Sequence, residues 1–443
     1  MPGSDEQDVA DPQRSARFDA MCEPVRARVL AGEPTNRARE RALALVARLG
    51  PGQRPPPGPI FSATPHLLVI RPDHLGDVLF TSPPLQWIRA VCSQATVTYM
   101  AGPWSAEVAE RLPGVFRVWS YRFPGFARSH PPGPLARVFP YIQLWWLARQ
   151  VRAERFDLAI NLRPDFWWGA ALMYLAGIPR RLGYVTRETT PFLTYGLPLP
   201  EPQHAVEDNL ALAETALAEL GHGYLDWQSP PVTLEPTPDD RAEASRLWTL
   251  HRLDAPQPGT EQTVPPVIAV APGAGSPAKV WDPERWALVI DHLAGRFGVR
   301  CLVTGTAAEQ PLAERLAAAL ATPAAVVAGE TPVGVLATLL QRCRLVVGPD
   351  NGALHLAAAM GVPTIRLYGP ADPALFGPYG TAEAHVVVQT PRACAACGYL
   401  DLPPPEQATT YPCMTDITAE EVIAAALQVW TATEGQPGSA LDA

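Results

Sequence analysis

The chain alternates short apolar runs with helix-length segments, and it does so in two separate series. In the first series the runs are "HLLVI", "TVTYMAG", "VFRVWSY" and "FDLAINL", between residues 66 and 162. Helix-length stretches separate them, among them residues 77–91. Strands that alternate with helices form βαβ units and pair into a parallel sheet. The first series therefore predicts one doubly wound α/β domain.

The second series follows two proline-rich zones, which begin at Gln228 and at Ala255 and flank one predicted helix, "DDRAEASRLWTL". Its apolar runs are "VIAVAP", "VRCLVTG", "AAVVAG", "RLVVG" and "TIRLYG". Open α/β sheets bind ligands at the carboxyl ends of their strands. The sequence therefore predicts an α/β protein with two doubly wound, Rossmann-like domains that face a central cleft.

These patterns divide the chain into four parts. The predicted parts are an N-terminal helical and proline-rich arm (1–62), a Rossmann-like domain (63–235), a linker (236–265) and a second Rossmann-like domain (266–443). Within the arm, a helix is predicted from about Arg14 to Leu49, ahead of the proline-rich "GPGQRPPPGPIFS". We assign no chemistry to the arm.

Charge and composition exclude several classes of protein. Lys and Arg total 35 against 44 Asp and Glu, so the net charge is −9 and nucleic acid is not an expected partner. No run approaches the roughly 18 apolar residues of a membrane span, and the N-terminus lacks a secretory pattern. Seven cysteines in 443 residues do not form a disulfide framework. We therefore expect a cytoplasmic protein.

Two stretches are unusually apolar, "YIQLWWLA" (141–148) and "FWWGAALMYLAGIP" (166–179). Both are too short to span a bilayer, and ionised residues flank them. They are either helix faces that pack in a core or an interfacial patch that meets a lipid-linked partner.

The stretch "LLVIRPDHLGDVLFTSPPLQWIRA" carries the first candidate site. A strand ends at Arg71, a loop contains Gly76 and Asp77, and a helix follows. Gly76 permits a close backbone approach. Asp77 is therefore either the N-cap of the helix or a general base that faces the cleft.

The stretch "VIAVAPGAGSPAKVWDPERWALVIDHL" carries the second candidate site. Its "GAGSPA" matches a dinucleotide fingerprint, but Pro272 and Pro277 stiffen the turn, and the helix is predicted to begin later, with Asp282 as N-cap. The next strand also lacks the acidic end that would bind a ribose, so a dehydrogenase is poorly supported. We predict instead that the loop N–H groups, Ser276 and Lys279 contact phosphates.

The stretch "LVVGPDNGALHLAAAMGVPTIRLYGP" carries the third. A strand ends on Asp350 and Asn351, and a helix is predicted from about Gly352, with His355 inside its first turn. These residues are either turn chemistry with a core histidine, or an anion site at the helix N-terminus. In the second interpretation Asp350 accepts from a sugar hydroxyl, and His355 orients a phosphate oxygen.

Taken together in their order along the chain, the three stretches resemble glycosyltransferase family 9, the heptosyltransferase family of lipopolysaccharide core assembly. The resemblance spans roughly residues 66 to 430, and the matching residues after the third stretch are "ADPALFGPYG". It implies a two-domain GT-B fold with an acceptor-binding N-terminal half and a donor-binding C-terminal half. It also implies inverting sugar transfer from a nucleotide sugar, ADP-heptose in the best-known members, without a metal or other cofactor. The absence of an Asp-x-Asp motif agrees with this.

The resemblance assigns a role to each matching residue. Asp77 is the base that takes the proton from the acceptor hydroxyl. The residues assigned to the donor are Gly275, Ser276, Lys279, Glu309, Asp350, Asn351, Gly352 and His355. The first three contact the diphosphate, Glu309 contacts the nucleoside ribose, and the last four form the corner for donor phosphate and sugar.

The residues assigned to the acceptor are Arg71, His74 and Arg163. The chain departs from the common family pattern at His74, where a hydroxyl residue is frequent, and at Asn351, where threonine or serine is frequent. Arg163 replaces a glutamine or histidine, which suits an anionic acceptor. The expected partners are thus a nucleotide-sugar donor and an anionic glycan or lipid-linked acceptor, with peripheral contact at the inner membrane surface.

Two other functions stay open at this point. A non-catalytic nucleotide-sugar-binding protein would be favoured if Asp77 were a buried cap. A nucleotide-sugar epimerase or hydrolase would need further carboxylates or histidines around the sugar, and the sequence shows no such cluster. Cys394, Cys397 and Cys413 are one ligand short of a closed zinc site, so they are structural thiols, a metal site or a redox pair.

Overall fold

The computed structural model describes residues 37–49, 58, 60, 62–124, 126, 139–223, 228–255, 264–380, 383–392, 396–398 and 411–433. Helix α2 (Arg37–Leu49) is the last third of the helix predicted in the arm, and the earlier part lies outside these ranges. The described chain divides into two compact units, which meet in sequence between Glu235 and Pro236.

The first unit contains one six-stranded sheet, and all of its strands run parallel. The strands are β1 (His66–Arg71), β2 (Thr96–Ala101), β3 (Val115–Ser120), β4 (Leu158–Asn161), β5 (Arg180–Tyr184) and β6 (Tyr195–Leu197). The helices that follow α2 are α3 (Leu75–Leu79), α4 (Ser82–Val91), α5 (Ala106–Ala109), α6 (Phe139–Ala153), α7 (Trp167–Leu175) and α8 (Ala205–Glu219).

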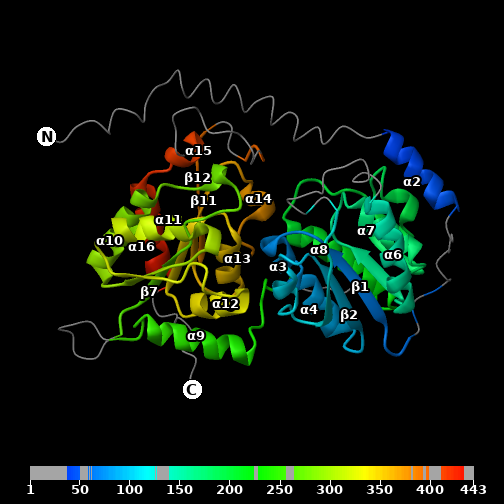
Figure 1. Cartoon of the computed structure of the whole chain (residues 1–443), viewed down its shortest axis with the longest axis horizontal. Helices are drawn as coiled ribbons and strands as arrows, with labels where there is room; N and C mark the ends of the chain where they lie inside the picture. Colours follow the sequence, from blue (N-terminus) through cyan, green and yellow to red (C-terminus); the bar gives the residue numbers. More distant parts are fainter. Residues whose placement is uncertain are drawn as a thin grey trace. The chain divides into compact units, whose positions relative to one another are not determined.

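The second unit contains another six-stranded parallel sheet, flanked by helices (Figure 1). Its strands are β7 (Val267–Val270), β8 (Arg300–Val303), β9 (Ala324–Val326), β10 (Leu345–Pro349), β11 (Thr364–Tyr368) and β12 (His385–Gln389). Its helices are α9 (Pro238–Leu250), α10 (Pro283–Phe297), α11 (Gln310–Ala319), α12 (Val333–Gln341), α13 (Gly352–Ala359), α14 (Pro373–Phe376), α15 (Pro412–Thr415) and α16 (Ala419–Ala432).

Both sheets have the same strand order. The first is β3-β2-β1-β4-β5-β6 and the second, read from its other edge, is β9-β8-β7-β10-β11-β12. The chain leaves the central pairs β1–β4 and β7–β10 in opposite directions, and ligands of open α/β sheets bind at such switch points. The predicted doubly wound fold is confirmed, and the loops after these four strands are where a site is expected.

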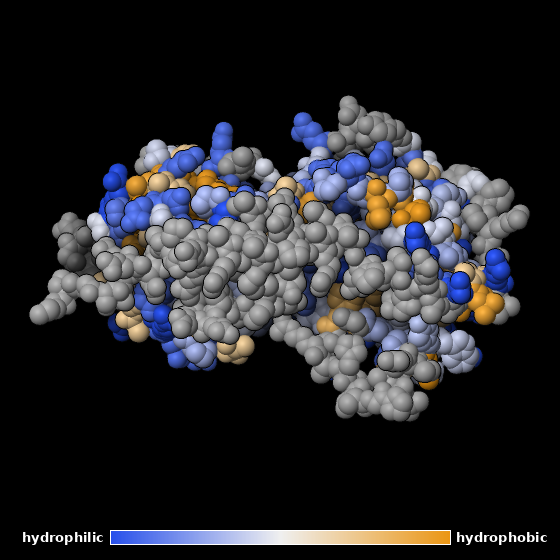
Figure 2. Space-filling view, turned by 90° about the horizontal axis from the view of Figure 1, so that it is seen from above, coloured by the Kyte–Doolittle hydropathy of each residue, from blue (hydrophilic) through white to orange (hydrophobic). Residues whose placement is uncertain are grey.

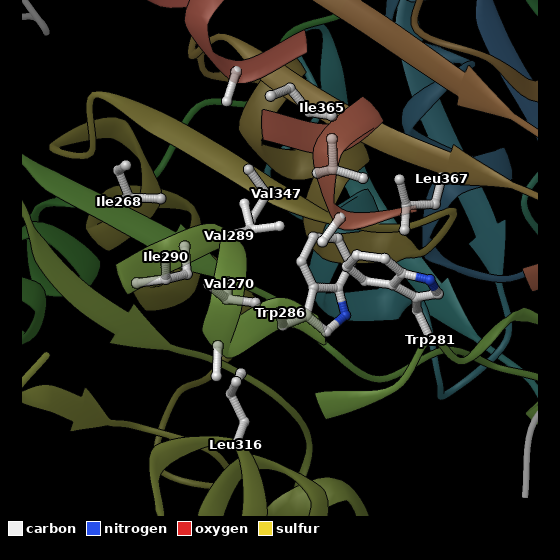
Figure 3. Close-up of a cluster of buried hydrophobic side chains, with 14 of the residues drawn as sticks. Ile268, Val270, Trp281, Trp286, Val289, Ile290, Leu316, Val347, Ile365 and Leu367 are labelled. Carbon is white, nitrogen blue, oxygen red and sulfur yellow. The ribbon is translucent and has the colours of Figure 1, made fainter. Parts of the chain in front are cut away.

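The core of the second unit fixes the ends of its central strands. Trp281 and Trp286 are fully buried, with ring centroids 4.6 Å apart in an edge-to-face arrangement. Figure 3 shows them beside Val270 of β7 and among apolar residues of β10 and β11. Trp286 lies on α10, whose N-cap is Asp282, as predicted, since its carboxylate accepts from the backbone N–H of Glu284 at 3.2 Å.

The structure corrects two features of the sequence prediction. The single helix predicted over 77–91 is wrong: α3 ends at Leu79 and a new helix begins at Ser82. Pro83 and Pro84 lie in the first turn of α4, where proline is tolerated because the N–H groups there have no helical partner. Strands β5, β6 and β12 were also missed; in β5, Arg180 and Arg181 made the segment look polar.

Both arginines are nevertheless buried and satisfied locally. Arg180 pairs with Glu219 at 2.9 Å, and Arg181 donates to the carbonyl of Phe192 at 2.6 Å. Glu219 neutralises the charge of Arg180, and backbone carbonyls accept from Arg181, so the strand fits inside the sheet despite its composition.

Candidate active site

In the first unit, Arg71 at the end of β1 joins three segments. Its Nε lies 2.6 Å from Oδ2 of Asp73, and its Nη2 lies 3.3 Å from Oδ1 of Asp77. Its Nη1 donates to the carbonyl of Leu162, just beyond β4, at 2.9 Å. The buried guanidinium therefore ties α3 and the β1 loop to the end of the neighbouring strand. Each nitrogen of the Arg71 guanidinium thus has a partner inside this unit, and Nη2 contacts Asp77.

Asp77 lies inside the short helix α3, and it is not the N-cap. The N-cap is the exposed His74, whose side chain makes no capping hydrogen bond. The side chain of Asp77 keeps 28% of its surface exposed while it pairs with Arg71. Burial of most of the carboxyl group raises its pKa above the ordinary value; Arg71 opposes this shift and Asp73 adds to it. A more basic, accessible carboxylate is suited to take a proton.

Arg163 joins this group from the loop after β4. It pairs with the buried Asp73 and, at 2.8 Å, with Asp165, and its guanidinium lies 5.0 Å from the ring centre of Phe126. Asp73 is thus shared by two arginines from neighbouring strand ends. The sequence prediction missed Asp73, although it lies between Arg71 and His74 in the same loop. One third of the Arg163 side chain stays exposed.

In the second unit, Asp350 at the end of β10 is the centre of another cluster. Its Oδ2 accepts from Nζ of Lys279 at 2.9 Å. Its Oδ1 lies 3.3 Å from Nε2 of His355 and 3.3 Å from the hydroxyl of Tyr368. Both carboxylate oxygens therefore have partners within the unit, so Asp350 positions Lys279. The contact from Asp350 to a sugar hydroxyl stays a prediction, since a carboxylate oxygen accepts more than one hydrogen bond.

A buried arginine of β11 fixes the protonation of His355. Arg366 is fully buried, and its Nη1 lies 3.0 Å from Nδ1 of His355 while Nη2 donates to the carbonyl of Leu354 at 2.9 Å. A guanidinium only donates, so Nδ1 must accept and the proton sits on Nε2, from which it is donated to Asp350. Burial and Arg366 lower the pKa of His355 to about 4, which agrees with the neutral ring.

The cluster has a net positive charge. At neutral pH Lys279 and Arg366 contribute two positive charges and Asp350 one negative charge, since His355 is neutral. The cluster adjoins the N-terminus of α13, where free N–H groups and the helix dipole favour an anion. Lys279 is also the only lysine in the 443-residue chain. The arrangement suits a diphosphate.

The remaining residues that were predicted to bind the donor lie in or beside the loop that follows β7. Asn351 caps α13 by accepting from Leu354 N at 3.1 Å, and its amide donates to the carbonyls of Ala271 and Gly273, at 3.0 and 2.7 Å. A Cβ placed on Gly273 would lie 2.1 Å from Oε1 of Glu309, so this glycine allows Glu309 to lie against the loop.

The second half of the loop contains Gly275 and Ser276. Ser276 accepts from the N–H of Ala278 at 3.1 Å and so caps the 3-10 turn η3 (Pro277–Lys279). A Cβ on Gly275 would meet nothing within 4 Å, which leaves room beside the loop for a bound group. All eight predicted donor residues therefore lie in the second unit, at the ends of β7, β8 and β10.

Metal-binding geometry is absent from the described ranges: no three His, Cys, Asp or Glu side chains converge there as ligands would. Cys397 and Cys413 are buried, and Cys394 lies outside the described residues. The three alternatives for these cysteines, structural thiols, a metal site or a redox pair, therefore all stay open.

The chain is similar in sequence to known proteins. Residues 144–398, just over half of the chain, match the family described as glycosyltransferase family 9 (heptosyltransferase). Lipopolysaccharide heptosyltransferase 2 of Escherichia coli is 25% identical over 323 residues, 69% of this chain and 83% of the relative. Lipopolysaccharide heptosyltransferase 1 of Pseudomonas aeruginosa is 27% identical over 360 residues, 75% of this chain and 85% of the relative.

Solved structures agree on the fold. The family 9 glycosyltransferase of Veillonella parvula has a TM-score of 0.67 at 23% identity and covers 84% of this chain and 99% of its own. The E. coli ADP-heptose lipopolysaccharide heptosyltransferase II has a TM-score of 0.63 at 22% identity, covering 84% and 100%. Two Rossmann-like domains of this kind make up the GT-B fold. The chain belongs to glycosyltransferase family 9.

The buried histidines predict a stability that falls with acidification. Burial, with Arg366 nearby, lowers the pKa values of His355 and His385 to about 4, whereas an unfolded histidine titrates near 6.5. The unfolded chain therefore binds more protons, and stability is lost as pH falls from about 6.5 towards 4. We expect the melting temperature to drop between pH 7 and 5. The exposed His292→Asn variant should keep the slope and His385→Asn should reduce it; a flat profile in the wild type would contradict the assignment.

Proposed function

We propose that this glycosyltransferase moves a heptose or related sugar from an ADP-linked donor to an anionic glycan or lipid-linked acceptor in cell-envelope polysaccharide assembly. The observation that carries the proposal is the positive cluster of Lys279, Asp350, His355 and Arg366 beside the N-terminus of α13. The names of the relatives support it, since they are lipopolysaccharide heptosyltransferases. One similar structure is described as E. coli heptosyltransferase WaaC with ADP, at 22% identity and a TM-score of 0.59.

Residues 266–443, which lie in the second unit, are assigned to the donor. Lys279 neutralises the diphosphate as it leaves, and the N–H groups at Gly352 and in the α13 first turn bind its oxygens. Asp350 and His355 hold the ammonium in place. Glu309 lies against the loop after β7, at Gly273, and is assigned to the ribose.

Residues 63–235, which lie in the first unit, are assigned to the acceptor. Asp77 takes the proton of the acceptor hydroxyl while that oxygen attacks the anomeric carbon, and the bond from this carbon to the diphosphate breaks. One displacement of this kind inverts the anomeric configuration. Arg71 orients Asp77. The exposed part of Arg163 is assigned to an anionic group of the acceptor, together with His74, which lies in the loop after β1.

A divalent cation has no assigned step in this proposal. The lysine and the helix N-terminus supply the positive charge that a cation would otherwise bring to the diphosphate. Product formation in the presence of EDTA, followed by NMR of the anomeric configuration, tests metal independence and inversion together.

The open space at Gly275 gives a test of donor binding that leaves the fold intact. Gly275→Ala should fold normally because its Cβ meets nothing within 4 Å, yet the methyl group would occupy the space assigned to the diphosphate. We expect the affinity for ADP, measured by calorimetry, to fall about tenfold, the usual effect of one methyl-sized misfit.

The matched control is Gly295→Ala on α10, where a Cβ also has open space. It should leave ADP affinity unchanged and slightly raise stability, since alanine is the better helix residue. If the wild type bound UDP more tightly than ADP, the assignment of an ADP-linked donor would be wrong. If it bound no nucleoside diphosphate, the assignment of the donor site would be wrong.

A further inference from the structure

Helix α6 (Phe139–Ala153) is apolar on two opposite sides. One side, with Leu144, Leu147, Ala148 and Val151, is buried in the core of the first unit. The opposite side presents Phe139, Ile142, Trp145 and Trp146, which are between 49% and 63% exposed. A helix that is apolar all round is normally covered all round. The outer side of α6 therefore has the composition of a buried surface but faces solvent.

This exposure is concentrated rather than scattered. Within the described ranges, fourteen large apolar side chains are strongly exposed, and five of them, counting Tyr141, lie on α6 within eight residues. Elsewhere in these ranges they occur singly or in pairs. Where the surface in Figure 2 is coloured, apolar patches lie among hydrophilic residues. Single exposed apolar residues need no explanation, whereas a contiguous group marks an interaction site.

The charges around this helix are positive. α6 contains no Asp or Glu, and Arg149 lies over the ring of Trp145, 5.0 Å from its centre. Arg152 and Arg155 are also exposed nearby in sequence, while the one carboxylate among them, Glu154, is paired with Arg117 at 2.9 Å. In a chain with a net charge of −9, this local excess favours a partner that is both apolar and negative.

A groove of about 320 Å³ lies beside the exposed side. It is lined by Tyr121, Ile142, Gln143, Trp146, Leu147 and Gln150. Tryptophan and tyrosine prefer the boundary between lipid headgroups and acyl chains, and arginine beside them contacts phosphate. No helix of the described chain is both long and apolar enough to cross a bilayer, so contact with lipid would be at the surface.

We propose that the outer side of α6, which we call the α6 face (Phe139, Ile142, Trp145, Trp146 and Arg149), docks on an anionic lipid bilayer. A second copy of this chain is a poorer partner, because a symmetric contact would bring the arginines of two such faces together. An interfacial helix of this kind buries its apolar side to a depth of about 5–10 Å. If the proposed function holds, docking presents the acceptor-binding unit to a lipid-linked glycan.

The test is sedimentation of the full chain with vesicles of phosphatidylcholine, with and without about one third phosphatidylglycerol. The wild type should bind the anionic vesicles, bind the neutral ones weakly, and be released by high salt. The Trp145→Gln/Trp146→Gln variant should lose about tenfold or more in binding. It should keep its melting temperature and its transfer rate to a water-soluble acceptor, which separates this proposal from the proposed function.

Two controls sharpen the experiment. Phe116→Gln removes a strongly exposed apolar side chain from β3 and should bind vesicles like the wild type. Arg149→Gln should weaken binding and Arg149→Lys should restore most of it. Equal binding by wild type and double variant, or no binding to either vesicle, overturns the proposal. A dimer in sedimentation velocity that the double variant abolishes, without lipid binding, would assign the face to a second copy.

Discussion

Asp77→Asn is expected to lower turnover by about 10²-fold or more, with donor affinity near that of the wild type. Asparagine keeps the size of the side chain and can still hydrogen-bond, but it cannot take the acceptor proton. Asp77 is not the N-cap of α3, so the substitution should cost little stability. Initial rates with a soluble acceptor, ADP affinity by calorimetry and the melting temperature measure the three effects separately.

The acid side of the rate profile adds a second measure of the same role. A base must be deprotonated to act, so kcat/KM should rise with pH through the pKa of Asp77, which burial raises above the ordinary value for aspartate. The matched control is Asp239→Asn, an exposed aspartate at the start of α9, and its rate should be unchanged. A fully active Asp77→Asn enzyme with normal stability would end the general-base proposal.

Lys279→Ala is expected to weaken ADP binding and to slow turnover by about 10²-fold, the usual effect of removing one charged donor from a developing anion. Lys279→Arg should recover only part of the activity, because a planar fork cannot reproduce a compact ammonium that contacts Asp350 at 2.9 Å. Steady-state kinetics with varied donor concentration give both KM and kcat.

A positioning variant separates the charge of Lys279 from its placement. Asp350→Asn keeps a hydrogen-bond acceptor for the ammonium but loses the ion pair, so its loss of activity should be smaller than that of Lys279→Ala. Kinetics of Lys279→Ala that match those of the wild type would remove Lys279 from the mechanism.

The fold was largely predictable because its signals are local. Apolar runs such as those of β1 and β10 marked strands, and Asp282 before a proline marked the start of α10. Strand β5 was missed because the partners that allow its arginines to be buried, Glu219 and Phe192, are distant in sequence.

The sequence predicted which residues belong to the site, but it did not predict which of them contact one another. Lys279, Asp350 and His355 were all assigned to the donor, and the structure brings them together. The contact between Asp350 and Lys279 could not be predicted, because the two residues are 71 positions apart and only the fold brings them together. Arg366 was missed for a similar reason: it lies in the middle of strand β11, and only the fold places it against His355.

The single lysine of this chain has a practical consequence. Thirty-four arginines supply every other basic side chain of the Lys and Arg total of 35, so the protein has one side-chain amine, and it lies in the positive cluster of the second unit. A reagent that acylates amines can therefore modify at most Lys279 and the terminal amino group. The intact mass of the labelled protein reports directly on whether that ammonium is accessible, and protection by a nucleotide would read out occupancy without a substrate turning over.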